Sequence, residues 1–60
     1  MKEMIQLRTG ELIIGYLVRQ YEAFEGSMRY IFRTDRGEYR CVKDEKGNYK
    51  ELVVWENIRQ

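Results

Sequence analysis

The stretch Ile5–Val18, IQLRTGELIIGYLV, contains the feature that decides the fold. A strand on the surface of a small domain alternates apolar and polar residues, because one of its faces contacts water. From Leu12 to Val18 this stretch is instead apolar at both parities, and only Gly15 interrupts it. A long strand that bends sharply belongs to two sheets in turn and changes its inward parity at the bend, and glycine within a strand often marks such a corner. The stretch therefore predicts a strongly bent strand with its corner, and its change of parity, at Gly15.

A helix is the alternative structure for the segment Leu12–Phe24. Apolar residues recur along this segment at helical spacing, at Ile14, Leu17, Val18, Tyr21 and Phe24. Gly15 in its interior and its β-branched residues favour a strand. We interpret the segment as a strand, and the periodicity alone leaves the helix open.

The remainder of the chain alternates between turn signals and short segments with β-propensity. Glycine-containing turn signals occur at residues 8–11, 24–27, 34–38 and 45–48. The segments between them are rich in Val, Ile, Tyr, Phe and Trp, and most alternate apolar and polar residues. Five short strands at this spacing predict an all-β fold, a small five-stranded, strongly bent antiparallel barrel that spans residues 1–60 as one domain.

The opening stretch also resembles the first motif of Sm-like proteins. That motif has a hydrophobic residue, a leucine, a turn that ends in glycine, and a second glycine five residues later before further apolar residues. The corresponding positions in this chain are Ile5, Leu7, Gly10, Gly15 and Leu17. Tyr21-Glu22 stands where the family has an aromatic residue followed by Asp, and Met28 stands on the Met that begins the third strand. The segment ELVVWENI, residues 51–58, resembles the last strands of Sm-like and SH3-like barrels.

Three departures from the Sm-like pattern change what the resemblance implies. Arg29 replaces the Asn that the family uses near its base pocket, and the loop before Met28 is longer. The Arg-Gly of the second motif is missing between Val54 and Ile58. The resemblance implies an oligomeric barrel that binds RNA or another single-stranded nucleic acid. Because arginine donates hydrogen bonds but accepts none, the family's uridine preference is not expected, and we expect weak, sequence-tolerant binding.

A predicted hairpin over residues 29–43 carries the residues that best fit such binding. The region around the hairpin is basic, because residues 27–50 hold seven basic and four acidic residues in a chain of net charge +1. Sheets that bind nucleic acids combine guanidinium groups for phosphates with rings for base stacking. The candidate nucleic-acid-binding residues are Arg29, Tyr30, Arg33, Arg36, Tyr39, Arg40 and Lys43. A turn at Arg36-Gly37 would set Arg33 opposite Arg40, whereas a three-residue loop over 35–37 would set Arg33 opposite Tyr39. Any half-exposed strand shows a similar alternation of rings and charges.

The composition argues against an enzyme. The chain has no histidine and one cysteine, so a structural zinc site and an internal disulfide are not expected. A nucleophile would lack its usual neighbouring base. We therefore expect no catalytic residues, no metal and no cofactor. Cys41 is expected to be a buried, inert thiol, and Asp44-Glu45 to be solvated turn charges.

The short length predicts self-association, because a 60-residue domain buries a small core. We expect homo-oligomers to form through an edge strand around KELVV, residues 50–54, and Trp55 either to plug the barrel or to lie in that interface. The longest apolar run has seven residues, against about 20 for a membrane helix, so neither a membrane nor a small-molecule substrate is expected as a partner. A lone thiol without an export signal indicates a cytoplasmic protein. The alternative function is an SH3-like protein-interaction or structural accessory module, of the small kind found in phages and mobile elements.

Overall fold

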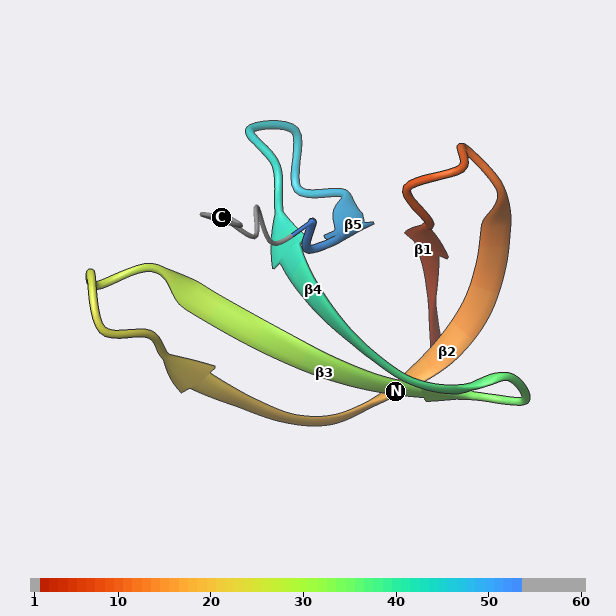
Figure 1. The fold of residues 1–60 in the computed structure, drawn as a ribbon, viewed down its shortest axis with the longest axis horizontal. Coiled ribbons are helices and arrows are strands. Elements are labelled where there is room, and N and C mark those ends of the chain that lie inside the picture. The colour runs from red at the N-terminus through yellow and green to blue at the C-terminus, as the bar shows by residue number, and fades with distance from the viewer. Residues whose placement is uncertain (1, 54–60) are drawn as a thin grey trace, which may run out of the picture.

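The computed structural model describes residues 2–53, in which five strands and no helix are formed. The strands are β1 (Lys2–Gln6), β2 (Leu12–Glu22), β3 (Met28–Thr34), β4 (Gly37–Lys43) and β5 (Tyr49–Glu51). They pair in chain order and close into a barrel (Figure 1). The predicted small five-stranded β-barrel is confirmed, as is the strand interpretation of the segment that begins at Leu12. No helix within the described residues is long and apolar enough to cross a membrane.

The closing pair of the barrel differs from the expected all-antiparallel arrangement. Consecutive strands pair antiparallel, whereas β1 and β5 pair parallel, with Ile5 opposite Tyr49 and Gln6 opposite Lys50. The reason is that in five consecutive antiparallel strands the first and the fifth run in the same direction. β5 is thereby paired on both sides, since Lys50 also lies opposite Val42 of β4. The predicted inter-subunit edge over residues 50–54 is therefore wrong at Lys50. Val54 and Trp55 lie outside the described residues.

β2 is the strand that bends, and its corner lies at Gly15. Its first part pairs with β1 as far as Tyr16, and its second part pairs with β3 from Tyr16 onward. Figure 1 shows β2 curving strongly between these two partners. A Cβ atom at position 15 would lie 3.0 Å from Cγ2 of Thr34 and 3.2 Å from Cβ of Phe32. The close approach of β3 therefore explains the glycine, and the predicted corner is confirmed.

The predicted change of inward parity at Gly15 is wrong. Ile13 and Leu17, on either side of Gly15 and at the same parity, both pack against the core. The parity changes only after Leu17, where a register shift separates it from Arg19. The other parity of β2, from Leu12 to Val18, faces outward and is exposed. The apolar residues at both parities thus reflect an apolar outer surface.

Three of the turns share one backbone design, and each contains a predicted turn signal. They span Leu7–Glu11, Ala23–Ser27 and Asp44–Asn48. In each, the N–H of the first residue donates to the carbonyl of the fifth, and the glycine N–H donates back to the first carbonyl, at 2.6–3.0 Å. The glycines have φ of +96°, +97° and +87°, a region that L-residues rarely adopt. These turn predictions are confirmed.

The core of the described part is small and partly aromatic. Its buried residues are Ile5, Leu7, Tyr30, Phe32 and Cys41. The Tyr49 ring packs edge-on against the rings of Tyr30 and Phe32, with centroids 5.1 Å and 4.8 Å apart. Cys41 is fully buried as predicted, and this burial raises the pKa of its thiol to about 11. Such a thiol is a poor nucleophile at neutral pH.

Candidate binding surfaces

The register of the β3–β4 hairpin sets an acidic residue between two of the candidate arginines. Glu38 lies opposite Arg33, and Arg40 lies opposite Ile31. Both registers derived from the sequence are wrong, because they set Arg40 or Tyr39 opposite Arg33. A carboxylate therefore interrupts the row of guanidinium groups along the outer face of the hairpin.

The side chain of Thr34 explains this register. Its hydroxyl donates to the carbonyl of Gly37 at 2.9 Å and accepts from the N–H of Arg36 at 3.0 Å. These bonds close the turn over Asp35 and Arg36, so that Gly37, at φ +112°, becomes the first residue of β4 opposite Thr34. A hydroxyl that bonds to the backbone two residues on is a common turn device.

Three of the candidate arginines are paired with carboxylates. The pairs, given by their shortest N–O distances, are Arg29–Glu25 at 2.5 Å, Arg33–Glu38 at 3.1 Å and Arg36–Glu11 at 2.5 Å. The Arg36 pair is bidentate, and its hydrogen bonds lower the pKa of Glu11. Within the described part of the chain, Arg40 forms no ion pair. Exposed pairs of this kind contribute little to stability, yet they neutralise charge that a phosphate would require.

The candidate residues also divide between the two faces of the hairpin. Arg29, Arg33 and Arg40 belong to the outer face, since each lies beside inward-facing neighbours along its strand. Tyr30 lies in the core, only 9% exposed, and Tyr39 is half-buried against that core. The ammonium group of Lys43 lies 5.2 Å from the ring centroids of Tyr30 and Tyr49. Tyr30 therefore offers no free ring face for a base, and its predicted stacking role is not compatible with this position.

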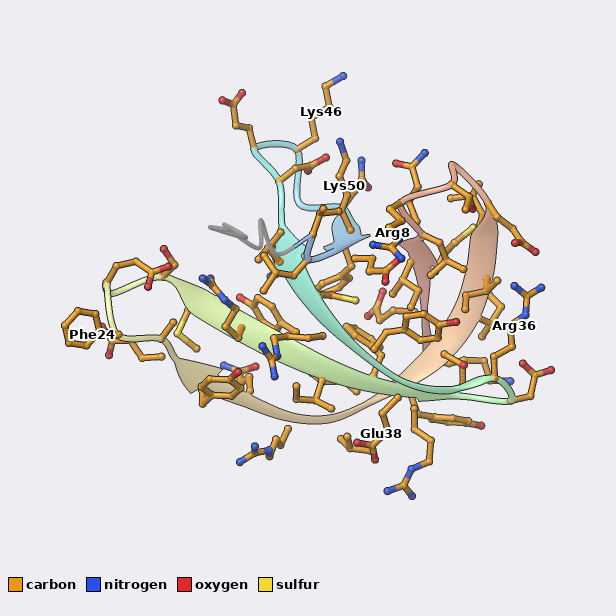
Figure 2. All side chains as sticks on the ribbon, viewed as in Figure 1. Arg8, Phe24, Arg36, Glu38, Lys46 and Lys50 are labelled. Atoms are coloured by element: carbon orange, nitrogen blue, oxygen red, sulfur yellow. The ribbon has the colours of Figure 1, made fainter. Side chains whose placement is uncertain are left out.

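Lysines gather instead at the β4–β5 end of the barrel. Lys43, Lys46 and Lys50 line a groove of about 600 Å³ together with Asp44, Glu45 and other polar residues, and Lys50 pairs with Asp44 at 3.7 Å. Figure 2 shows Lys46 and Lys50 at this end of the molecule. Asp44 is not a freely solvated charge as expected, because its carboxylate accepts the N–H groups of Lys46 and Asn48, each at 2.9 Å. The hydrogen bond from Asn48 is the main cause of the lowered pKa of Asp44.

A second surface, which the sequence analysis missed, covers the outside of β1 and β2. Five large apolar side chains are 41–59% exposed there, namely Met4, Leu12, Ile14, Tyr16 and Val18. We call these five residues the β1–β2 outer face. Met4 lies opposite Ile14 in the ladder, so the face is continuous across the two strands. The sequence shows apolar residues at both parities of β2, but a change of inward parity at a bend predicts the same pattern as an apolar outer face.

One further apolar side chain, Phe24, lies at the tip of the β2–β3 hairpin. It is fully exposed, and Figure 2 shows it projecting beyond the turn at one extreme of the molecule. Its neighbours in sequence include Glu22 and Glu25, and Glu25 pairs with Arg29. A solvent-exposed phenylalanine on a projecting hairpin has the geometry of an interface anchor.

Residues 2–53 contain no cluster of three or more His, Cys, Asp or Glu side chains that could hold a metal ion. Comparison with known proteins finds no matching family, no similar curated protein and no similar solved structure. The likeness to Sm-like proteins therefore remains a resemblance in the motif residues and in the shape of a small barrel.

Proposed function

We propose that this protein is a protein-interaction module whose docking surface is the β1–β2 outer face. The observation that carries the proposal is the continuous row of five large apolar side chains, each about half exposed, on two paired strands. Single exposed apolar residues are ordinary, but a contiguous patch of them is typical of an interaction site. Removing apolar surface from water is favourable by about 25 cal/mol per Å², which gives a partner a reason to cover the face.

The composition of the face supports a protein partner over a nucleic acid. Met4 and Ile14 at the centre of the face are opposite each other and uncharged, whereas Tyr16 is flanked by Lys2 and Arg33 on the neighbouring strands. Methionine and tyrosine are enriched in protein interfaces, and charged residues are depleted at the centre of such interfaces. A nucleic-acid surface would instead need unpaired cations, and most of the candidate arginines already have carboxylate partners.

Site-specific photocrosslinking tests this proposal. A photoreactive residue at position 14 should form adducts with a protein partner in extract of the native cells, whereas the same residue at position 46 should form none. Position 46 is a matched control because Lys46 is exposed but lies in the lysine-lined groove. A second substitution in the face, Leu12→Asp, should abolish the adducts from position 14. Equal adducts at both positions, or adducts that persist in the Leu12→Asp protein, would refute the proposal.

A second candidate function is the binding of single-stranded nucleic acid at the β4–β5 end. The groove lined by Lys43, Lys46 and Lys50 favours it, because Lys43 and Lys46 form no ion pair among residues 2–53, whereas Lys50 pairs with Asp44 at 3.7 Å. Phosphate contacts from these cations would make the affinity fall with salt. Oligonucleotide titrations at low and high salt separate this function from the first, since a face of apolar residues has little salt dependence.

A further inference from the structure

We propose that the occupant of the β1–β2 outer face is a second copy of this chain, whose Phe24 hairpin tip docks in a groove beside that face. This inference rests on the proposed function, because it names the partner of the same surface. The groove has a volume of about 580 Å³ and lies between the outer face and the β3–β4 turn. Ile13, Ile14 and Tyr16 supply its apolar side chains.

The tip is already ordered for docking. Within its turn, the N–H of Ala23 donates to the carbonyl of Ser27 at 2.6 Å, and the N–H of Gly26 donates to the carbonyl of Ala23 at 2.9 Å. The pair between Glu25 and Arg29 ties the turn to β3. A preformed loop loses little conformational entropy on binding. Burial of one phenylalanine removes about 150–250 Å² from water, the largest apolar contribution this tip can make.

Charge favours the same pairing. The tip carries Glu22 and Glu25; Glu25 is already paired with Arg29, whereas Glu22 forms no ion pair among residues 2–53. The groove is lined by three cations, Lys2, Arg33 and Arg36, and by the single acid Asp35. Glu38 pairs with Arg33 and Glu11 pairs with Arg36, so Lys2 is the lining cation that forms no ion pair among residues 2–53. Docking of Phe24 in the groove would bring Glu22 toward Lys2 at the groove's rim, so the tip and the groove each offer an apolar part and one unpaired charge of opposite sign.

The two surfaces lie too far apart for one chain to use both on itself. The molecule is 39 Å along its longest axis. Figure 2, in which that axis is horizontal, shows Phe24 at one end and Arg36 of the groove toward the other. Contact must therefore form between copies, tip to groove, in a heterologous arrangement. Such head-to-tail contacts generate a ring when the rotation closes and a filament when it does not.

Mixing two complementary variants tests the inference. Phe24→Ser removes the anchor and keeps the groove, whereas Ile14→Glu keeps the anchor and places a carboxylate in the groove. In sedimentation velocity the wild-type mass should rise with concentration, and each variant alone should stay monomeric over the same range. An equimolar mixture should form a species of twice the monomer mass and no larger, since one tip and one groove remain intact in that pair.

Arg8→Ser is the matched control, because Arg8 holds the same position in its turn as Phe24 does in the β2–β3 turn. It should associate like the wild type, and thermal melts at low concentration should show that all variants fold. A wild type that is monomeric at every concentration would overturn the inference, as would a Phe24→Ser protein that associates normally or a mixture that stays monomeric. If Ile14→Glu alone prevents association, the face packs on its own copy, and the inference fails while the proposed function stands. Crosslinks from position 14 to a different protein would separate the two claims in the same way.

Discussion

Alanine at position 15 measures how closely β2 approaches β3 at the corner of the barrel. The added Cβ would lie 3.0 Å from Cγ2 of Thr34 and 3.2 Å from Cβ of Phe32, both shorter than ordinary van der Waals contact. Neither neighbour can move freely. The Thr34 side chain is fixed by its hydroxyl bonds to the turn, and Phe32 is fully buried. Overpacking of a well-packed site costs about 1–3 kcal/mol.

A second effect of the same substitution has the opposite sign. Alanine restricts the unfolded chain and is favoured over glycine inside a strand by about 0.5–1 kcal/mol. The contact distances make the steric effect the larger one, so Gly15→Ala should lower the free energy of unfolding by about 1 kcal/mol. Gly15→Val adds two methyl groups at the same point and should lower it further. Urea unfolding at one low protein concentration measures both changes, because the midpoint then excludes any contribution from association.

Thr34→Ser provides the matched background. It removes Cγ2 and keeps the hydroxyl that closes the β3–β4 turn. In this background Gly15→Ala should be less destabilising, and the difference is the coupling energy of the double-mutant cycle. A Gly15→Ala protein that is as stable as the wild type, or a cost that is the same in both backgrounds, would refute the explanation of Gly15 by contact with Thr34.

Three other predictions concern Cys41, Asp44 and the cationic groups. Stability should fall as pH rises from about 9 to about 11, because burial raises the pKa of Cys41 to about 11 and the unfolded chain releases the thiol proton first. The difference in melting temperature between the wild type and Cys41→Ala should therefore shrink across this range, and a constant difference would contradict the prediction. Asp44→Ala should lower the urea midpoint at pH 7. Because folding lowers the pKa of Asp44, the carboxylate stabilises the protein above its unfolded pKa, and this contribution is lost as pH falls through the folded pKa. The urea midpoints of the two proteins should therefore become equal in acid. If single strands bind at the β4–β5 end, Lys46→Ala should reduce the salt slope of the affinity by about 0.7, because Lys46 lines the groove and forms no ion pair among residues 2–53. Arg33→Ala should leave the slope unchanged, because Arg33 lies outside the groove and pairs with Glu38.

The features of the fold that were predictable are those that depend on short segments. Glycines at fixed places in the turns and a glycine inside an apolar strand report local backbone requirements, and both are visible in one sequence. The hairpin register was not predictable, because it depends on which backbone groups the Thr34 hydroxyl bonds to. A turn one residue earlier or later would use the same amino acids and give a different set of opposite residues.

The candidate site was less predictable than the fold for a related reason. Arg36 is neutralised by Glu11, which is 25 residues away in the sequence, so no local pattern announces the pair. Tyr30 shares its strand parity with the core residue Phe32, and this parity indicated burial more reliably than the interleaving with arginines indicated stacking. The apolar outer face was visible in the sequence, but an apolar residue in a strand does not report whether its side chain lies inside the barrel or outside it.

The two apolar faces of β2 suggest how folding and association are divided in this protein. Strands that are apolar at both parities are typical of sheets covered on both sides. In this chain the barrel interior covers one side, where Ile13 and Leu17 pack, and nothing within residues 2–53 covers the side of Ile14 and Tyr16. A domain of this size leaves about 40% of its unfolded surface exposed and has little stability to spare. A second copy bound at the outer face would bury part of this second apolar side of β2 as well. The stability of the barrel would then depend on protein concentration.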